Sequence, residues 1–212
     1  MATKKEETAK EETKAQCKNP HERMFELMGL LYKPHPWHGL NPGPEAPVVV
    51  TAYIECVPGE GIKYEVDKPT GYLKVDRPHK YSSLCPSIYG FLPQTYCGNR
   101  VAQRAMERNP TLGTIHGDCD PIDICVLSTR DIKHGDLILS CRPIGGLRMI
   151  DDGEADDKII AVLIGDPLMS GFTDITHIPK SLLDLLRHYF LTYKQSPDAM
   201  DPKVSIPEVY GR

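Results

Sequence analysis

The segment from Asp118 to Asp123 constrains the fold of this chain more than any other, because three carboxylates in six residues run directly into an apolar stretch, 124–127. A short apolar run of this kind is typical of a buried strand. The fold must therefore place the end of a buried strand beside a cluster of acids. Three acids held by Pro121 indicate either a metal site or a solvated acidic turn, and this segment alone supports both equally.

The spacing excludes a calcium-binding loop of the EF-hand type. Such a loop also opens with acids at its first and third positions, but it needs a ligand at position five, glycine at six and glutamate at twelve. This chain has Ile122, Asp123 and Thr129 at those positions. What remains is a strand end with several hard oxygen ligands, the type that Mg²⁺ or Mn²⁺ prefers.

A second acidic segment, 151–158 (DDGEADDK), also leads into an apolar run, 159–164. Two acidic loops therefore each lead directly into a predicted buried strand. This repetition favours a metal site over a solvated turn.

Composition limits the remaining possibilities. The chain has 212 residues, 40% of them hydrophobic, which is enough for one compact domain but scarcely for two. Its formal charge of −4 argues against a general nucleic-acid-binding protein, which needs a basic surface. No apolar run reaches the roughly 18 residues of a transmembrane helix, so we expect a soluble protein. The seven cysteines include no Cys-x-x-Cys pair, which favours reduced thiols in a reducing compartment.

Apolar alternation between glycine- and proline-rich turns predicts strands at 48–57, 62–68, 72–77, 122–128, 137–142 and 158–163. Such short strands favour a closed or partly closed barrel. Apolar residues at three- and four-residue spacing predict a helix over 181–193, and a shorter helix is predicted over 24–31. The polar segment 97–116 is expected to be a surface loop. The histidine pair in segment 35–38 lies beside the only tryptophan, and we interpret this segment as packing against the domain surface.

The stretch from Asp118 to Ile124 resembles the signature of the family I soluble inorganic pyrophosphatases, Asp-x-Asp-Pro-apolar-Asp-apolar, at every required position. The resemblance runs from about His35 to Lys194 and includes segments 62–68, 75–77 and 89–91. It implies an α+β, mainly β fold: an OB-type five-stranded β-barrel with flanking helices. We expect a mobile N-terminal tail over residues 1–20, which has nothing apolar to bury, and a single pyrophosphatase domain over 21–212.

The resemblance also implies an activity, which is Mg²⁺-dependent hydrolysis of inorganic pyrophosphate to two orthophosphates by a metal-activated water. Several Mg²⁺ ions per active site are implied, with Mn²⁺ as a possible substitute. The expected partners are the small-molecule substrate and other copies of the chain, as a dimer or a hexamer, without nucleic acid or membrane. The expected location is cytoplasmic.

The resemblance assigns roles to individual residues. Asp120 is implied as the general base that contacts the attacking water. The implied metal ligands are Glu55, Glu65, Asp118, Asp123, Asp151 and Asp156. The implied catalytic and substrate-binding groups around them are Lys63, Arg77, Tyr89, Lys158, Tyr193 and Lys194. One departure is visible, because Cys85-Pro86 stands where many members have Tyr-Pro, so no phosphate contact is assigned there.

Two other functions use the same features. A metal-dependent phosphomonoesterase or phosphodiesterase would need the same carboxylates. A non-catalytic OB module that binds nucleic acid is a poorer fit, because the chain is acidic and has only four Phe and one Trp for base stacking.

Overall fold

The computed structural model describes residues 20–198 and 202–212, and the chain divides into one unit up to Pro34 and a second unit, His35–Arg212. The described part of the first unit is essentially one helix, α2 (Pro20–Leu31), which includes the predicted helix 24–31. Proline suits the first turn of a helix because its missing N–H would have no helical partner there. The tail predicted over 1–20 lies outside the described residues, apart from Pro20, and its boundary stays a prediction.

The second unit is built on a closed ring of five strands, as predicted. In ring order the strands are β1 (Val50–Cys56), β4 (Ile88–Phe91), β6 (Asp123–Leu127), β9 (Lys158–Leu163) and β7 (Leu137–Asp151). Strand β7 pairs with β1 and so closes the ring. Within the ring only the β6–β9 pair is parallel, and the other four pairs are antiparallel. This is the five-stranded OB-type barrel.

The two parallel strands are buried on both faces, which explains their continuous apolar runs. On β6, Ile124 and Val126 belong to the apolar cluster that contains the β1 residues, whereas Cys125 and Leu127 belong to the cluster under the C-terminal helix. On β9, Ala161 faces the first cluster and Ile160 the second. Neither face of these strands can therefore be polar, except at the ends where the acidic segments begin.

Strand β7 is longer than predicted, extending to Asp151 rather than stopping at Arg142. The predicted strand ended before Pro143, but β7 continues through Gly145 and Gly146, which allow a close approach by Tyr210: a Cβ at Gly146 would lie 2.4 Å from the Tyr210 ring. Tyr210 belongs to β10 (Val204–Gly211), a strand that the sequence did not predict and that pairs with β7. The C-terminal strand thus lengthens the sheet at the end where the second acidic segment lies.

A separate two-stranded sheet consists of β2 (Ile62–Val66) and β3 (Leu73–Pro78), both of which were predicted. The turn between them is closed by the Gly71 N–H, which donates to the Asp67 carbonyl at 2.7 Å. Gly71 has a φ of +76°, a conformation that glycine adopts without strain.

The prediction of a featureless loop over 97–116 was wrong, because this segment contains helix α3 (Asn99–Arg108) and leads into β5 (His116–Gly117). The buried positions of α3 are Ala102 and Ala105, and their small side chains give little apolar signal in the sequence. Strand β5 pairs with β8 (Glu154–Ala155), inside the second acidic segment. The insert therefore packs against one of the two acidic loops.

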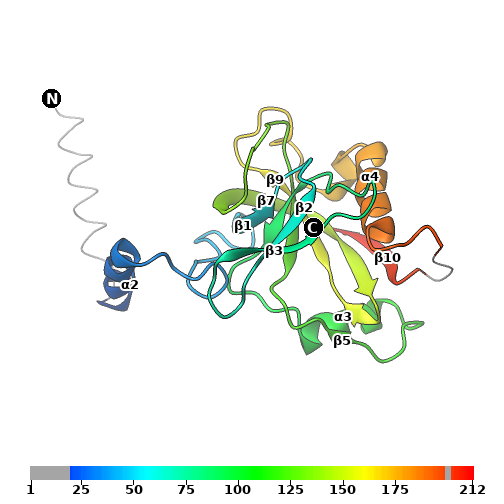
Figure 1. Cartoon of the computed structure of the whole chain (residues 1–212), viewed down its shortest axis with the longest axis horizontal. Helices are drawn as coiled ribbons and strands as arrows, with labels where there is room; N and C mark the ends of the chain where they lie inside the picture. Colours follow the sequence, from blue (N-terminus) through cyan, green and yellow to red (C-terminus); the bar gives the residue numbers. More distant parts are fainter. Residues whose placement is uncertain (1–19, 199–201) are drawn as a thin grey trace. The chain divides into compact units, whose positions relative to one another are not determined.

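Helix α4 (Lys180–Thr192), preceded by the short 3₁₀ turn η1 (Ile175–His177), confirms the clearest helix prediction. Its buried residues Leu186, Tyr189 and Phe190 cover one side of the barrel, as predicted (Figure 1). Among the described residues, no helix is both long and apolar enough to cross a membrane.

Candidate active site

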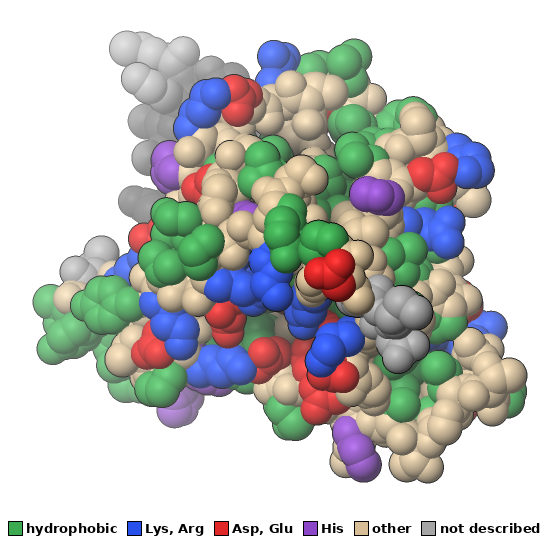
Figure 2. Space-filling model, turned by 45° about the vertical axis from the view of Figure 1, so that its right-hand side comes forward, with side chains coloured by type: hydrophobic (Ala, Val, Ile, Leu, Met, Phe, Trp, Pro, Cys, Tyr) green, Lys and Arg blue, Asp and Glu red, His purple; other side chains and the backbone are tan. Residues whose placement is uncertain are grey.

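A pocket of about 490 Å³ at the end of the barrel contains all thirteen residues that the sequence singled out. Lysine and arginine side chains lie among aspartates and glutamates across a hollow in the face that Figure 2 shows. The barrel strands supply Glu55, Tyr89, Asp123, Asp151 and Lys158, and the neighbouring loops, the β2–β3 hairpin and the residues that directly follow α4 supply the rest. The structure thus brings the predicted residues together, while their individual roles stay predictions.

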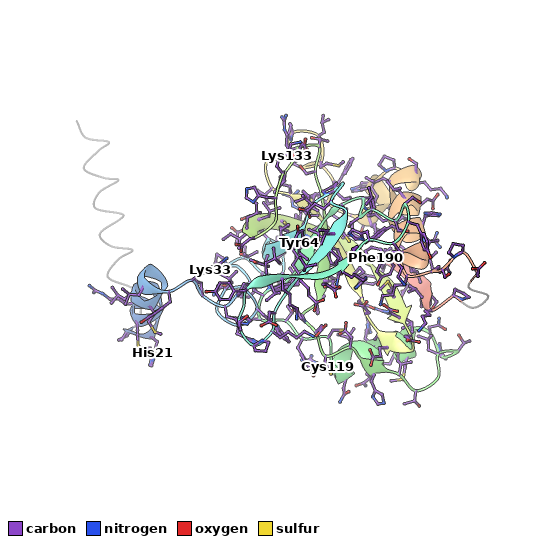
Figure 3. The ribbon with its side chains drawn as sticks, in the orientation of Figure 1. His21, Lys33, Tyr64, Cys119, Lys133 and Phe190 are labelled. Carbon is purple, nitrogen blue, oxygen red and sulfur yellow. The ribbon has the colours of Figure 1, made fainter. Side chains whose placement is uncertain are left out.

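Lys158 is the centre of the pocket's buried charge network. Its side chain is 2% exposed, and its Nζ donates to Asp123 and, at 2.5 Å, to Asp156 Oδ1. The ammonium also lies 5.9 Å from the Tyr89 ring centroid and 5.8 Å from that of Phe190, which is labelled in Figure 3. Burial lowers the pKa of Lys158, but Asp123 and Asp156 raise it more, so that the pKa lies well above its usual value. This lysine is therefore held charged and fixed.

The pocket collects more negative charge than its cations balance. Burial, together with repulsion from Asp156, raises the pKa of Asp118 to about 7. Burial also raises the pKa of Glu55 to about 8, although its Oε1 accepts the Val66 N–H at 2.7 Å. Raised pKa values of this kind follow mainly from burial, which the cations of the chain do not offset.

Asp151 provides a more direct indication of a missing partner. Its side chain is 9% exposed, and its Oδ2 accepts bonds from Lys194 and, at 3.3 Å, from the Tyr193 hydroxyl. Its Oδ1 is buried without any hydrogen-bond partner. A buried carboxylate oxygen without a partner costs free energy, which a bound cation would recover.

These observations fit divalent cations, although the carboxylates are not yet gathered around one point. In the described part of the chain, no three acidic, histidine or cysteine side chains are close enough to form a coordination site by themselves. Ammonium groups pair with carboxylates of the predicted ligand set instead: Lys158 binds Asp123 and Asp156, Lys194 binds Asp151, and Lys63 binds Glu65 at 3.3 Å. Hard oxygen donors in excess, one of them unpaired, are the chemistry that Mg²⁺ selects.

Asp120 is held differently from the other acids. Its backbone N–H donates to Asp118 Oδ1 at 3.1 Å, whereas its own carboxylate forms an ion pair with Lys68 through Oδ1. The Asp120 side chain is 35% exposed and lines the pocket. It can therefore be reached by a water molecule in the pocket.

The sequence missed several residues that line the pocket, including Trp37, Lys68, His79 and Lys203. Lys68 closes the matched segment 62–68, but it lies in a turn, where strand alternation does not indicate the direction of a side chain. Cys85, the departure from the family pattern, is buried against the pocket and donates to the Ser87 carbonyl at 3.3 Å.

The two acidic segments are joined at the carbonyl of Ala155. This oxygen accepts the Asp118 N–H at 3.3 Å and the Cys97 thiol at 3.1 Å. Cys97 in turn donates its N–H to the Asp120 carbonyl at 2.7 Å and accepts from the Cys119 N–H at 2.9 Å. Cys119 itself has an exposed thiol and is labelled in Figure 3. The base of the 97–116 insert thus fixes one acidic segment to the other.

Comparison with known proteins supports the resemblance. A family model described as inorganic pyrophosphatase matches residues 52–212. The inorganic pyrophosphatase of Chlamydia caviae is 48% identical over 182 residues, covering 84% of each chain. Soluble inorganic pyrophosphatase 3 of Arabidopsis thaliana is 38% identical, over 90% of this chain and 82% of its own. The crystal structure of the inorganic pyrophosphatase from Thermus thermophilus superposes with a TM-score of 0.69 at 30% identity, covering 84% of this chain and 90% of the other.

Proposed function

Because the chain belongs to the inorganic pyrophosphatase family and hydrolyses inorganic pyrophosphate, we propose that the pocket residues divide this reaction into metal binding, phosphate binding and proton removal. Water attacks one phosphorus, the bridging P–O bond breaks, and two orthophosphates leave. The observation that supports the proposal best is the arrangement of nine carboxylates, the seven predicted ones among them, beside lysine and arginine side chains in one pocket. The phosphomonoesterase and nucleic-acid-binding alternatives are not favoured by the family match.

We assign metal binding to the six predicted carboxylates, with Mg²⁺ as the ion and Mn²⁺ as its substitute. The unpaired Asp151 Oδ1 and the raised pKa values of Asp118 and Glu55 support this assignment, because each would be relieved by a divalent cation. When bound, Mg²⁺ supplies positive charge that makes water easier to ionise and neutralises the phosphate oxygens. The ligands in this assignment are Glu55, Glu65, Asp118, Asp123, Asp151 and Asp156.

We assign phosphate binding to the cations and hydroxyls that face these carboxylates. Phosphoryl transfer depends mainly on positioning and charge neutralisation, and donors fixed in advance contribute most. Lys158 is fixed by burial, and the Arg77 guanidinium lies 5.9 Å from the Tyr193 ring centroid. The groups in this assignment are Lys63, Arg77, Tyr89, Lys158, Tyr193 and Lys194.

We assign proton removal to Asp120. A general base must be reachable by water and must keep an oxygen free to accept the proton. Among the described residues, Lys68 is the only side chain that bonds the Asp120 carboxylate, and it does so through Oδ1, which leaves Oδ2 for water. Of the other predicted carboxylates, Asp123 and Asp156 are bound by the buried Lys158, and Glu55 and Asp151 are themselves buried.

The resemblance also supports a homo-oligomer, as a dimer or a hexamer, and a cytoplasmic location. The test of the proposed chemistry is phosphate release from pyrophosphate and from p-nitrophenyl phosphate, each with Mg²⁺, with Mn²⁺ and with no divalent ion. We expect rapid release from pyrophosphate with Mg²⁺ and little from the monoester. Preference for the monoester would contradict the proposal. An Asp151→Asn variant should also bind Mg²⁺ more weakly in calorimetry, whatever its activity.

A further inference from the structure

We propose that Lys68 is a positioning residue for catalysis, holding the Asp120 carboxylate in place, and that the segment His35–His38 fixes Lys68 and Asp120 relative to each other. The inference rests on the proposed role of Asp120 as general base. Neither Lys68 nor segment 35–38 belongs to the predicted site. The observations that support it are a set of hydrogen bonds that connects both residues to one short segment.

The first side of this connection runs through His35. The Trp37 N–H donates to His35 Nδ1 at 3.1 Å, so the imidazole carries its proton on Nε2. Nε2 donates to the Lys68 carbonyl at 2.8 Å. The ring also packs against Gly71, where a Cβ would lie 2.9 Å from it. The turn that carries Lys68 is therefore fixed by both a hydrogen bond and close packing.

The second side runs through Trp37. Its indole Nε1 donates to the Thr95 carbonyl at 2.7 Å, and the Gln94 N–H donates to the Trp37 carbonyl at 2.8 Å. The Thr95 hydroxyl then accepts the N–H of Ile122 at 2.8 Å, two residues from Asp120. Segment 35–38 thus holds the acidic segment through Thr95 and the Lys68 turn through His35.

The ion pair between Lys68 and Asp120 closes this arrangement. The Lys68 side chain is 47% exposed, and an ion pair this exposed contributes little to stability by itself. The backbone of Lys68 is nevertheless held by His35, so the Lys68 ammonium bonds Asp120 Oδ1 from a fixed backbone position. A general base that is misplaced by even a small distance loses much of its effect. Lys68 therefore has a function in orientation that its small energetic contribution would not indicate.

Steady-state kinetics on the full chain with Mg²⁺ and pyrophosphate tests the proposal. We expect Lys68→Met to lower kcat by about tenfold, less than the ~10²–10⁴-fold effect of losing a general base, and to leave KM unchanged. Lys68→Arg should restore most of kcat. Lys74→Met is the matched control: Lys74 lies on the same hairpin, is 51% exposed and pairs with Asp67 at 3.2 Å, outside the pocket. This control should have the same kcat and KM as the natural chain.

The decisive measurement is the double variant. If Lys68 acts through Asp120, Lys68→Met should cause no further loss of kcat in the Asp120→Asn background. His35→Leu should cause a smaller loss than Lys68→Met, and that loss should also vanish in this background. Circular dichroism and Mn²⁺ binding by calorimetry should be unchanged in Lys68→Met, which separates orientation from folding and from metal affinity.

Several results would overturn the inference. A rise in KM with unchanged kcat would make Lys68 a phosphate-binding group instead. Additive losses in the double variant would show that Lys68 acts independently of Asp120. If Asp120→Asn lowers kcat and Lys68→Met does not, the role of Lys68 fails while that of Asp120 stands. If Asp120→Asn keeps its full kcat, the general-base assignment fails, and the role of Lys68 fails with it.

Discussion

Two carboxylates of the pocket, one from each acidic segment, are held in different ways. In the second segment, Asp156 is bound by Lys158, which is almost completely buried. In the first, Asp120 is partly exposed and is bound by the half-exposed Lys68. A buried ion pair is rigid and is costly to break, whereas an exposed pair is worth little and leaves its carboxylate accessible. The difference separates carboxylates suited to holding ions from one suited to accepting a proton.

Removal of metal should have the largest effect, because both segments lack sufficient cations. We expect excess EDTA to abolish pyrophosphate hydrolysis and added Mg²⁺ to restore it, as measured by phosphate release. Full activity in EDTA would mean that the carboxylates of neither segment need a divalent ion.

Exchange of individual aspartates should then separate the roles within the first segment. Asp120→Asn should lower kcat by about 10²–10⁴-fold with little change in metal affinity, because an amide keeps the size but cannot accept a proton. Asp118→Asn and Asp123→Asn should instead weaken metal binding, and higher Mg²⁺ should recover part of their activity. The measurement is kcat for each variant across Mg²⁺ concentration. Recovery of Asp120→Asn by Mg²⁺ would make Asp120 a ligand.

Removing each lysine should show the energetic difference between the buried and the exposed lysine directly. Lys158→Met should lower the free energy of unfolding of the metal-free protein by about 3–5 kcal/mol, since it leaves buried carboxylates uncompensated. Lys68→Met should change it by less than about 1 kcal/mol. Urea denaturation measures both free energies of unfolding. Added Mg²⁺ should restore part of the free energy that Lys158→Met loses. Equal values for the two variants would contradict the comparison.

The metal-free protein should lose stability as the pH rises. Asp118 and Glu55 have pKa values of about 7 and about 8 when folded, above the ~4 expected for unfolded chains. An acid whose pKa is raised by folding stabilises the protein fully below the unfolded pKa, and this contribution is lost as the pH rises through the folded pKa. The melting temperature in EDTA should therefore fall between about pH 4 and pH 8. In Asp118→Asn the melting temperature should fall less over this range. A melting temperature that rises with pH in the natural chain would contradict the prediction.

The smallest effect is expected at Cys119, the residue between two of the aspartates. Its thiol is exposed, so Cys119→Ser should change the free energy of unfolding by less than about 0.5 kcal/mol and leave kcat nearly unchanged. Cys97→Ser makes an informative comparison, because the Cys97 thiol is buried and bonds the Ala155 carbonyl. A collapse of turnover in Cys119→Ser, with the fold intact, would assign that thiol a function.

Apolar patterns predicted the barrel strands and α4, because strands buried on both faces leave a clear local signal. The five-stranded OB type, and most of the residues that meet in the pocket, came from the resemblance to the family. Apolar patterns missed α3, whose buried residues are two alanines. They also ended β7 at Arg142, whereas the strand continues to Asp151 through pairing with β10, which is distant in the sequence. Lys68 was missed because its direction depends on a turn that His35 holds from a distant part of the chain.

The insert between Cys97 and Gly117 begins and ends at almost the same point. A Cβ at Gly117 would lie 2.2 Å from the Cys97 carbonyl oxygen, so the two ends of the insert touch and only glycine fits there. Its ends and its helix α3 pack against the second acidic segment, so only the exposed stretch beyond α3 is free to change in length. A longer loop there costs only about 0.6 kcal/mol of entropy per doubling of its length. New surface can therefore be added beside this active site while the catalytic geometry is inherited unchanged.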